Sequence, residues 1–172
     1  MPSHFAGGKA CKLMTQIILE TFILAPLQLC FDYARDIGLH CETLKETRER
    51  AIGGTTSGRI NLGESVTFEG KHLGLRRQLT AKITEMEAPH RFVDEMVAGS
   101  FKSLKHIHEF EETTHNAQSG TLMRDTLQWQ APFGPLGTLA DIFLLRRHLR
   151  KILTQRNKRL KALLERQITG LK

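Results

Sequence analysis

Cysteine and the large polar aromatics are scarce in this sequence, and their scarcity excludes several classes of protein. Its 172 residues include three cysteines, one Trp and one Tyr, and no CxxC pair occurs. An odd cysteine count without paired spacing argues against a disulfide framework or a zinc ribbon and favours reduced thiols in a cytosol. So few Trp and Tyr residues leave poor platforms for stacking single-stranded nucleic acid.

Long apolar runs and the familiar phosphate-binding and hydrolase motifs are absent as well. No run approaches the roughly 20 apolar residues that a membrane-spanning helix needs. The patterns GxxxxGKS/T, GxGxxG, GxSxG and HExxH do not occur. Residues 1–11 contain no apolar core of a secretory signal, so we expect a flexible lead-in and a cytoplasmic protein.

The composition predicts one domain with an uneven charge distribution. Hydrophobic residues make up 40% and charged residues 25% of the chain, which suits a single soluble domain over residues 12–168. Residues 1–145 hold 15 Lys/Arg and 17 Asp/Glu, whereas residues 146–172 hold 10 Lys/Arg and one acid. This basic stretch is either a solvated helix face or a surface for an anionic partner. Its candidate contact residues are Arg146, Arg147, Arg150, Lys151, Lys158, Arg159 and Lys161.

The first third of the chain predicts a strand and two short helices. Residues 12–20 are rich in Ile and Leu, as strands often are, and Pro26 suits the first turn of a helix. The apolar residues of that helix share one face: Leu27, Cys30, Phe31 and Ala34. Gly38 is expected to end it, residues 39–44 to form a second short helix, and the glycine-rich residues 53–58 to form a loop.

The remainder predicts an antiparallel sheet followed by a long helix. Short spacers imply antiparallel neighbours among six strand-like stretches, at 47–52, 62–69, 76–86, 91–98, 101–112 and 121–130. Two of the turns are expected at 70–74 and 116–120. After a Pro/Gly hinge, residues 138–167 contain neither Pro nor Gly and predict a helix about 45 Å long. Such a helix must bury its apolar stripe, so we expect an α+β fold in which a curved sheet surrounds the helix and leaves a cavity.

Five segments carry a resemblance to a known superfamily. They are 25-APLQLCFDYARD, 92-FVDE, 106-HIHEFE, 120-GTLMRD and 133-FGPLG. Together they resemble the START-like (SRPBCC) superfamily, which includes the birch-pollen allergen group and the polyketide cyclase/dehydrase-like lipid-transport group. Within it, they resemble an uncharacterised bacterial subgroup.

This resemblance implies a helix-grip fold, in which a seven-stranded curved antiparallel sheet wraps around a long C-terminal helix. It further implies two small helices after the first strand and an internal cavity for a lipid, a quinone or a polyketide-like molecule. The superfamily shares no catalytic residue set, so none is transferred to this chain. The sequence departs from the subgroup at Leu79, where Trp is usual, and at Ser100, where Pro is usual. The change at Leu79 bears on the shape of the cavity.

Alternation along three strands assigns a set of side chains to the cavity wall. Residues two apart on a strand share a face, and one face of each strand combines large apolar groups with ionisable ones, as pocket walls do. The predicted ligand-binding residues on these faces are Phe92, Asp94, Met96, His106, His108, Phe110, Met123, Asp125, Leu127 and Trp129. Arg156 joins them from the apolar stripe of the last helix. A buried Arg needs a partner, and three interpretations stay open: an ion pair with Asp94 or Asp125, a side chain that snorkels to solvent, or a contact with a ligand carboxylate.

Four of these residues have the chemistry for catalysis: Asp94, His106, His108 and Asp125. They could form an acid–base pair, a metal site or a hydrogen-bonded polar network. Because HxH is a weak two-residue signal, the sequence leads us to expect no metal and no cofactor.

Three functions follow from these observations. The leading hypothesis is a non-catalytic carrier or sensor that binds a hydrophobic small molecule in its cavity. The first alternative is an enzyme of the cyclase or dehydratase type that uses a His/Asp pair. The second is an interaction protein whose basic C-terminal helix contacts the ribosome, an anionic membrane or an acidic protein. The sequence leaves the oligomeric state open.

Overall fold

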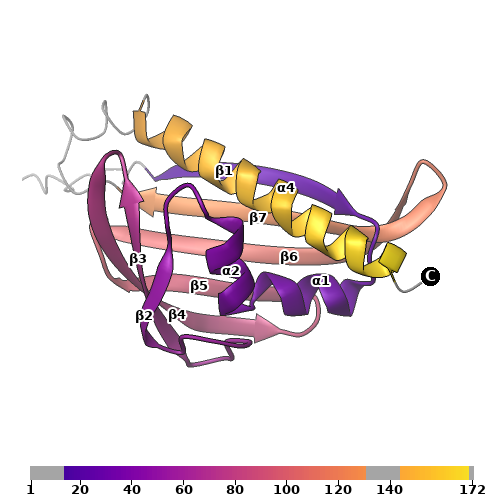
Figure 1. Ribbon diagram of the computed structural model, residues 1–172, viewed down its shortest axis with the longest axis horizontal. Helices are drawn as coiled ribbons and strands as arrows, with labels where there is room; N and C mark the ends of the chain where they lie inside the picture. Colours follow the sequence, from indigo (N-terminus) through magenta and orange to yellow (C-terminus); the bar gives the residue numbers. More distant parts are fainter. Residues whose placement is uncertain (1–13, 131–143, 171–172) are drawn as a thin grey trace, which may run out of the picture.

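A single antiparallel sheet and a long helix dominate the computed structural model, which describes residues 14–130 and 144–170. The strands follow the order β1-β7-β6-β5-β4-β3-β2 across the sheet. Their bounds are β1 Thr15–Ile23, β2 Arg50–Gly54, β3 Ser65–His72, β4 Leu75–Glu87, β5 Arg91–Ala98, β6 Ser103–His115 and β7 Gln118–Gln130. The helices are α1 Leu27–Ala34, α2 Ile37–Thr43 and α4 Arg146–Gly170. The predicted α+β helix-grip fold is confirmed: α4 runs across the curved sheet, and α1 and α2 lie beside it on the same face (Figure 1).

Two hairpins in the sheet turn through pairs of residues with positive φ. The β3–β4 turn uses Leu73 and Gly74, with φ of 50° and 83°, and the β6–β7 turn uses Asn116 and Ala117, with φ of 50° and 60°. Such mirror-image two-residue turns match the twist of the strands that they join. The turns are therefore shorter than the sequence predicted.

Gly120 lies inside β7, not in the turn where the sequence placed it. A Cβ atom on Gly120 would lie 2.4 Å from the backbone oxygen of Ile23, so glycine allows β1 and β7 to meet closely there. The expected glycine loop at 53–58 is corrected in part for a similar reason. β2 extends through Gly54 after a bulge at Ile52, and a Cβ on Gly54 would approach the Ser65 oxygen to 2.1 Å.

The two short helices cover the inner face of the sheet beside α4, and α1 lies nearer than α2 to the C-terminus of α4 (Figure 1). The apolar face predicted for α1 is confirmed, because its four apolar residues are all buried: Leu27, Cys30, Phe31 and Ala34. The interpretation of Gly38 as a helix stop is wrong. α1 ends at Ala34, and Gly38 lies in the first turn of α2. The Asp36 carboxylate caps α2 by accepting from the Leu39 N–H at 3.0 Å, which is the usual work of an N-cap residue.

Helix α4 buries one stripe against the sheet and against both short helices. Its buried residues are Leu153, Arg156, Asn157, Leu160 and Leu164. Residues 138–143, where the sequence expected the helix to begin, lie outside the described residues, as does the expected lead-in at 1–11. The single domain over 12–168 stays a prediction. In the described parts of the chain, no helix has the length and apolar character needed to cross a membrane.

The larger of the two buried apolar clusters includes residues of α1, β5, β6 and the C-terminal half of α4. The Phe31 ring packs edge-on against Phe92 and Phe110, with centroids 5.7 and 5.8 Å away. Leu160 and Leu164 close this cluster from α4. A second cluster, Ile17, Leu104, Leu127, Trp129 and Leu153, lies toward the other end of the sheet.

Candidate functional site

A cavity of about 640 Å³ lies between the sheet and the N-terminal half of α4. Its described lining is mostly apolar, with Phe68, Leu79, Phe101, Leu104, Leu127 and Leu149 among the walls. A smaller cavity of about 130 Å³ shares His40, Asp94 and His106 with it. These shared side chains form the polar end of the larger cavity, and His72, Gln78 and His148 add polar groups elsewhere in the lining. The volume falls within the range of small-molecule sites in proteins.

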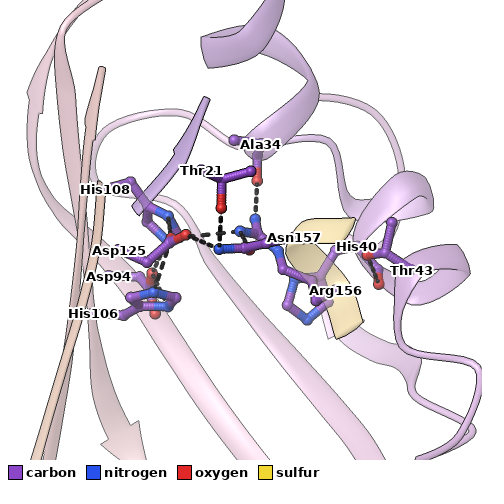
Figure 2. A network of polar contacts seen from close by, with 10 residues as sticks. All are labelled: Thr21, Ala34, His40, Thr43, Asp94, His106, His108, Asp125, Arg156 and Asn157. Atoms are coloured by element: carbon purple, nitrogen blue, oxygen red, sulfur yellow. Dashed lines mark hydrogen bonds and ion pairs between the residues drawn. The ribbon is translucent and has the colours of Figure 1, made fainter. Parts of the chain in front are cut away.

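Asp125 is the centre of a buried polar network behind that end (Figure 2). Its side chain is wholly inaccessible to solvent. Its Oδ1 atom lies 2.7 Å from His108 Nδ1 and 3.1 Å from His106 Nε2. Both nitrogens lie within hydrogen-bonding distance of this oxygen, although neither ring is aligned well with it. The other oxygen, Oδ2, accepts a hydrogen bond of 2.6 Å from the Asn157 amide.

Asp94 approaches the same two imidazoles from the cavity side. Its Oδ2 atom lies 3.2 Å from His108 Nε2, in hydrogen-bond geometry, and 4.0 Å from His106 Nδ1. The register explains this meeting, because Asp94 pairs with His106 across β5 and β6, and His108 pairs with Asp125 across β6 and β7. The Phe92 ring stacks on His108 with centroids 4.2 Å apart, which fixes that imidazole from one face.

Arg156 enters this network from α4 and is 4% exposed. Its Nη1 lies 3.5 Å from Asp125 Oδ1 and 3.1 Å from Asn157 Oδ1. Its Nη2 donates to the Ala34 carbonyl at 3.2 Å. Of the three interpretations of this residue, the structure shows the ion pair with Asp125, and such burial excludes snorkelling to solvent.

The charges in the network shift each other's pKa values in directions that fit the geometry. Burial alone would raise the pKa of Asp125, but contacts with His106 and His108 outweigh it and hold the pKa well below its usual range. Burial would lower the pKa of His108, but Asp125 and Asp94 on either side raise it overall. For His106, burial and the neighbouring His108 lower the pKa. Asp125 is therefore ionised near neutral pH.

His40, on α2, is the third histidine at the polar end of the cavity. Its ring stacks on Phe68, with centroids 4.3 Å apart. Removal from water and the positive charge of Arg156 lower the pKa of His40 to about 3, so the ring is neutral at ordinary pH. Figure 2 shows it on the far side of Arg156 from the Asp125 network.

The residues predicted for the site separate into three groups. Asp94, His106 and Leu127 line the larger cavity. Phe92, His108 and Arg156 line the smaller one. The remaining predicted residues stand on the same inner face but are not among the lining side chains: Met96, Phe110, Met123, Asp125 and Trp129. The condition that a cyclase-type mechanism requires, a His and a carboxylate that meet at a cavity, is present at His108 and Asp94, which lie 3.2 Å apart and both line the smaller cavity.

Sequence reasoning missed two members of the network, His40 and Asn157. Asn157 was open to detection, since it lies four residues after Leu153 and seven before Leu164, on the same buried stripe. Nothing local singled out His40, because its position depends on how α2 packs over β3.

Two of the basic side chains predicted to contact an anionic partner have partners within the protein. Arg159 pairs with Glu46 and donates to the Thr43 carbonyl at 2.8 Å. Lys161 donates to the Phe22 carbonyl at 2.7 Å. The other five residues of the predicted contact set are exposed: Arg146, Arg147, Arg150, Lys151 and Lys158. A further surface cleft of about 730 Å³, beside β2 and β3, is lined mainly by charged residues and lies away from the buried network.

Comparison with known proteins agrees with the fold. No family model and no curated protein matches the chain. Among solved structures, TTHA0849 from Thermus thermophilus is 16% identical with a TM-score of 0.65, over 87% of this chain and 99% of that one. CV1439 from Chromobacterium violaceum is 12% identical with a TM-score of 0.65, over 87% and 96%. Ginseng major latex-like protein 151 from Panax ginseng is 12% identical with a TM-score of 0.60, over 88% and 98%.

At these identities the likeness defines the fold alone. It is the START-like helix-grip fold that the sequence resemblance implied.

Proposed function

We propose that this protein binds a hydrophobic small molecule in the cavity between its sheet and α4. The observation that supports this most is the cavity itself, with about 640 Å³ of space and walls formed mainly by Leu and Phe side chains. Filling such a space removes apolar surface of the ligand from water, at about 25 cal/mol per Å² of buried area. The START-like resemblance, with its lipid, quinone or polyketide-like ligands, points to the same class of molecule.

The polar end of the cavity supports a defined orientation for the ligand. Asp94, His106 and His40 meet the apolar walls there, whereas the walls on the opposite side include Leu144 and Leu145. Pockets of this kind hold the ligand by apolar burial and orient it with a few polar groups. We therefore expect an elongated apolar ligand that carries one hydrogen-bonding group at the end near His106.

Fluorescence titration with 1-anilinonaphthalene-8-sulfonate tests the proposal directly. We expect saturable binding at one site with a Kd on the order of micromolar. Leu104→Trp on β6 and Leu149→Trp on α4 add bulk to the cavity from opposite walls, and each should weaken binding of the probe by about tenfold or more. The matched control is Leu62→Trp, because Leu62 is 58% exposed and is not among the residues that line either cavity.

The pattern across these three variants decides the outcome. Weaker binding of the probe by both cavity variants, together with unchanged binding by Leu62→Trp, supports the proposal. Equal affinity in all three variants, or no saturable binding by the unmodified chain, would overturn it. Native mass spectrometry of freshly purified protein then identifies the class of any retained molecule.

A further inference from the structure

Three ligand atoms of the kind that bind transition metals converge at the wall of the cavity. They belong to Asp94, His106 and His108, and they lie within 4.8 Å of one another. Two of the residues, Asp94 and His106, line the larger cavity, and all three line the smaller one. Two imidazoles and one carboxylate form a donor set that zinc and ferrous iron favour.

The surrounding residues turn the correct edges of both imidazoles toward that point. His106 and His108 each place one nitrogen near the Asp125 Oδ1 atom, at 3.1 and 2.7 Å. A ring nitrogen beside an ionised carboxylate carries the proton, which leaves the opposite nitrogen as a lone pair. Those opposite nitrogens, His106 Nδ1 and His108 Nε2, lie 4.0 and 3.2 Å from Asp94 Oδ2. Three electron-pair donors therefore converge on one point.

The charge balance of this region also favours a cation. Two carboxylates, Asp94 and Asp125, lie in the network together with one guanidinium, that of Arg156. Facing lone pairs repel unless a positive charge lies between them. A proton on His108 is one such charge, and a divalent ion is the other. The ion has the advantage that it engages His106 Nδ1 as well, whose distance of 4.0 Å from Asp94 is too long for a hydrogen bond.

We propose that Asp94, His106 and His108 bind one divalent transition metal ion, and that Asp125 positions both imidazoles for it. The bonds would be made by Asp94 Oδ2, His106 Nδ1 and His108 Nε2. A carboxylate that holds the far nitrogen of a ligating imidazole is the standard support of such sites, and here a single carboxylate supports two. The remaining coordination positions face the cavity, where a polar group of a bound molecule can reach them. The proposal is independent of the hydrophobic ligand and is tested without it.

Titration of chelator-treated full-length protein with Co²⁺ provides the first test. We expect one Co²⁺ per chain, visible absorption bands of a protein-bound ion, and displacement by Zn²⁺. Asp94→Asn, His106→Gln and His108→Gln should each weaken binding by about a hundredfold or more. Asp125→Asn should keep the stoichiometry of one ion and weaken binding by about 10- to 100-fold, as expected for a positioning residue.

A second pair of histidines in the cavity supplies the matched control. His72 and His148 have ring centroids 5.7 Å apart, and both line the larger cavity. His148→Gln should leave the Co²⁺ affinity and spectrum unchanged. Loss of Co²⁺ binding in His148→Gln would overturn the proposal. So would Co²⁺ binding that survives both His106→Gln and His108→Gln.

NMR of the imidazole nitrogens tests the site in the unmodified chain, so the result does not depend on whether the variants fold. Saturating Zn²⁺ should shift His106 Nδ1 and His108 Nε2 and leave the nitrogens of His72 and His148 unchanged. No shift at His106 and His108, or no stoichiometric ion, refutes the site and identifies a proton as the charge that holds the network. Repeating the fluorescent-probe titration on metal-free protein separates the two proposals, because probe binding without metal leaves the cavity function intact.

Discussion

The space between the sheet and α4 is filled at one end and hollow at the other. At the filled end, Phe31, Phe92 and Phe110 pack together and Leu160 and Leu164 close over them. At the hollow end, the N-terminal half of the same helix forms one wall of a cavity of about 640 Å³. One helix therefore stabilises the fold with its C-terminal half and lines the cavity with the other. Asp125 and its partners lie at the boundary.

The difference follows from the elements that each half of α4 faces. Its buried stripe from Leu153 to Leu164 meets α1, α2 and β1, where apolar residues interlock. Residues 144–152 face the β3–β4 hairpin across the cavity instead, and the hairpin residues Leu73 and Leu75 are exposed. A core gains stability from close packing, whereas a binding site must leave space unfilled. The comparison predicts that substitutions at the two ends will lower the free energy of unfolding by different amounts.

Truncation of Leu160, at the filled end, should cause the largest loss of stability. Leu160→Ala removes a side chain that is 2% exposed, and the rigid aromatic neighbours limit collapse into the space left behind. We expect the free energy of unfolding to fall by about 3 to 4 kcal/mol, measured by urea denaturation. A loss below about 1 kcal/mol would show that this end is as poorly packed as the other.

Neutralising Asp125, at the boundary, should have the next largest effect. Asp125→Asn leaves the Arg156 guanidinium buried without its carboxylate, and we expect a loss of about 3 kcal/mol in the free energy of unfolding. The double variant Asp125→Asn/Arg156→Met should recover part of this loss, because it removes the unpaired charge. Equal stability of the single variant and the unmodified chain would mean that Ala34 and Asn157 suffice to hold Arg156.

Most of the fold and half of the site follow from patterns local in the sequence. The alternation of period two placed Phe92, Asp94 and His106 on the inner face, and the helical stripe placed Arg156 inside. What local patterns did not supply was the detail of contacts between distant elements. Gly120 resembled a turn residue, yet it permits the approach of β1, about 100 residues earlier in the chain.

The polar network illustrates the same limit. Composition suggested that two histidines and two carboxylates would interact, and the structure unites them. Which oxygen meets which nitrogen depends on the register of β5, β6 and β7, which no segment encodes alone. The stacking of His40 on Phe68 depends on the docking of α2 over the sheet, and it too was beyond a local pattern.

Acidification should lower the free energy of unfolding through His40, which lies at the hollow end. The pKa of His40 is about 3 in the folded protein and about 6.5 in an unfolded chain. Between these values the unfolded chain binds more protons, so stability falls as the pH is lowered. From pH 7 to pH 5 we expect a loss of about 1 to 2 kcal/mol from this residue, the lower figure reflecting its partial exposure. The charged or titratable groups that act on it are Arg156, Asp94, His106 and His108.

The variant His40→Phe isolates this contribution. Phenylalanine retains the stacking on Phe68 but cannot bind a proton, so its stability should depend less on pH than that of the unmodified chain. Urea denaturation of both proteins at a series of pH values gives the two slopes. Identical slopes would assign the pH dependence to other groups and leave His40 without a role in it.

Truncation of Leu149, at the hollow end, should have the smallest effect. Leu149 lies on the same helix as Leu160, eleven residues earlier, but one side of it faces the cavity and only the other packs against the second apolar cluster. Leu149→Ala therefore removes few contacts, and alanine has the higher helix propensity. We expect a loss below about 1 kcal/mol, against about 3 to 4 kcal/mol for Leu160→Ala. If both variants lose the same stability, side chains fill the two ends of the space alike, and α4 has no half reserved for a ligand.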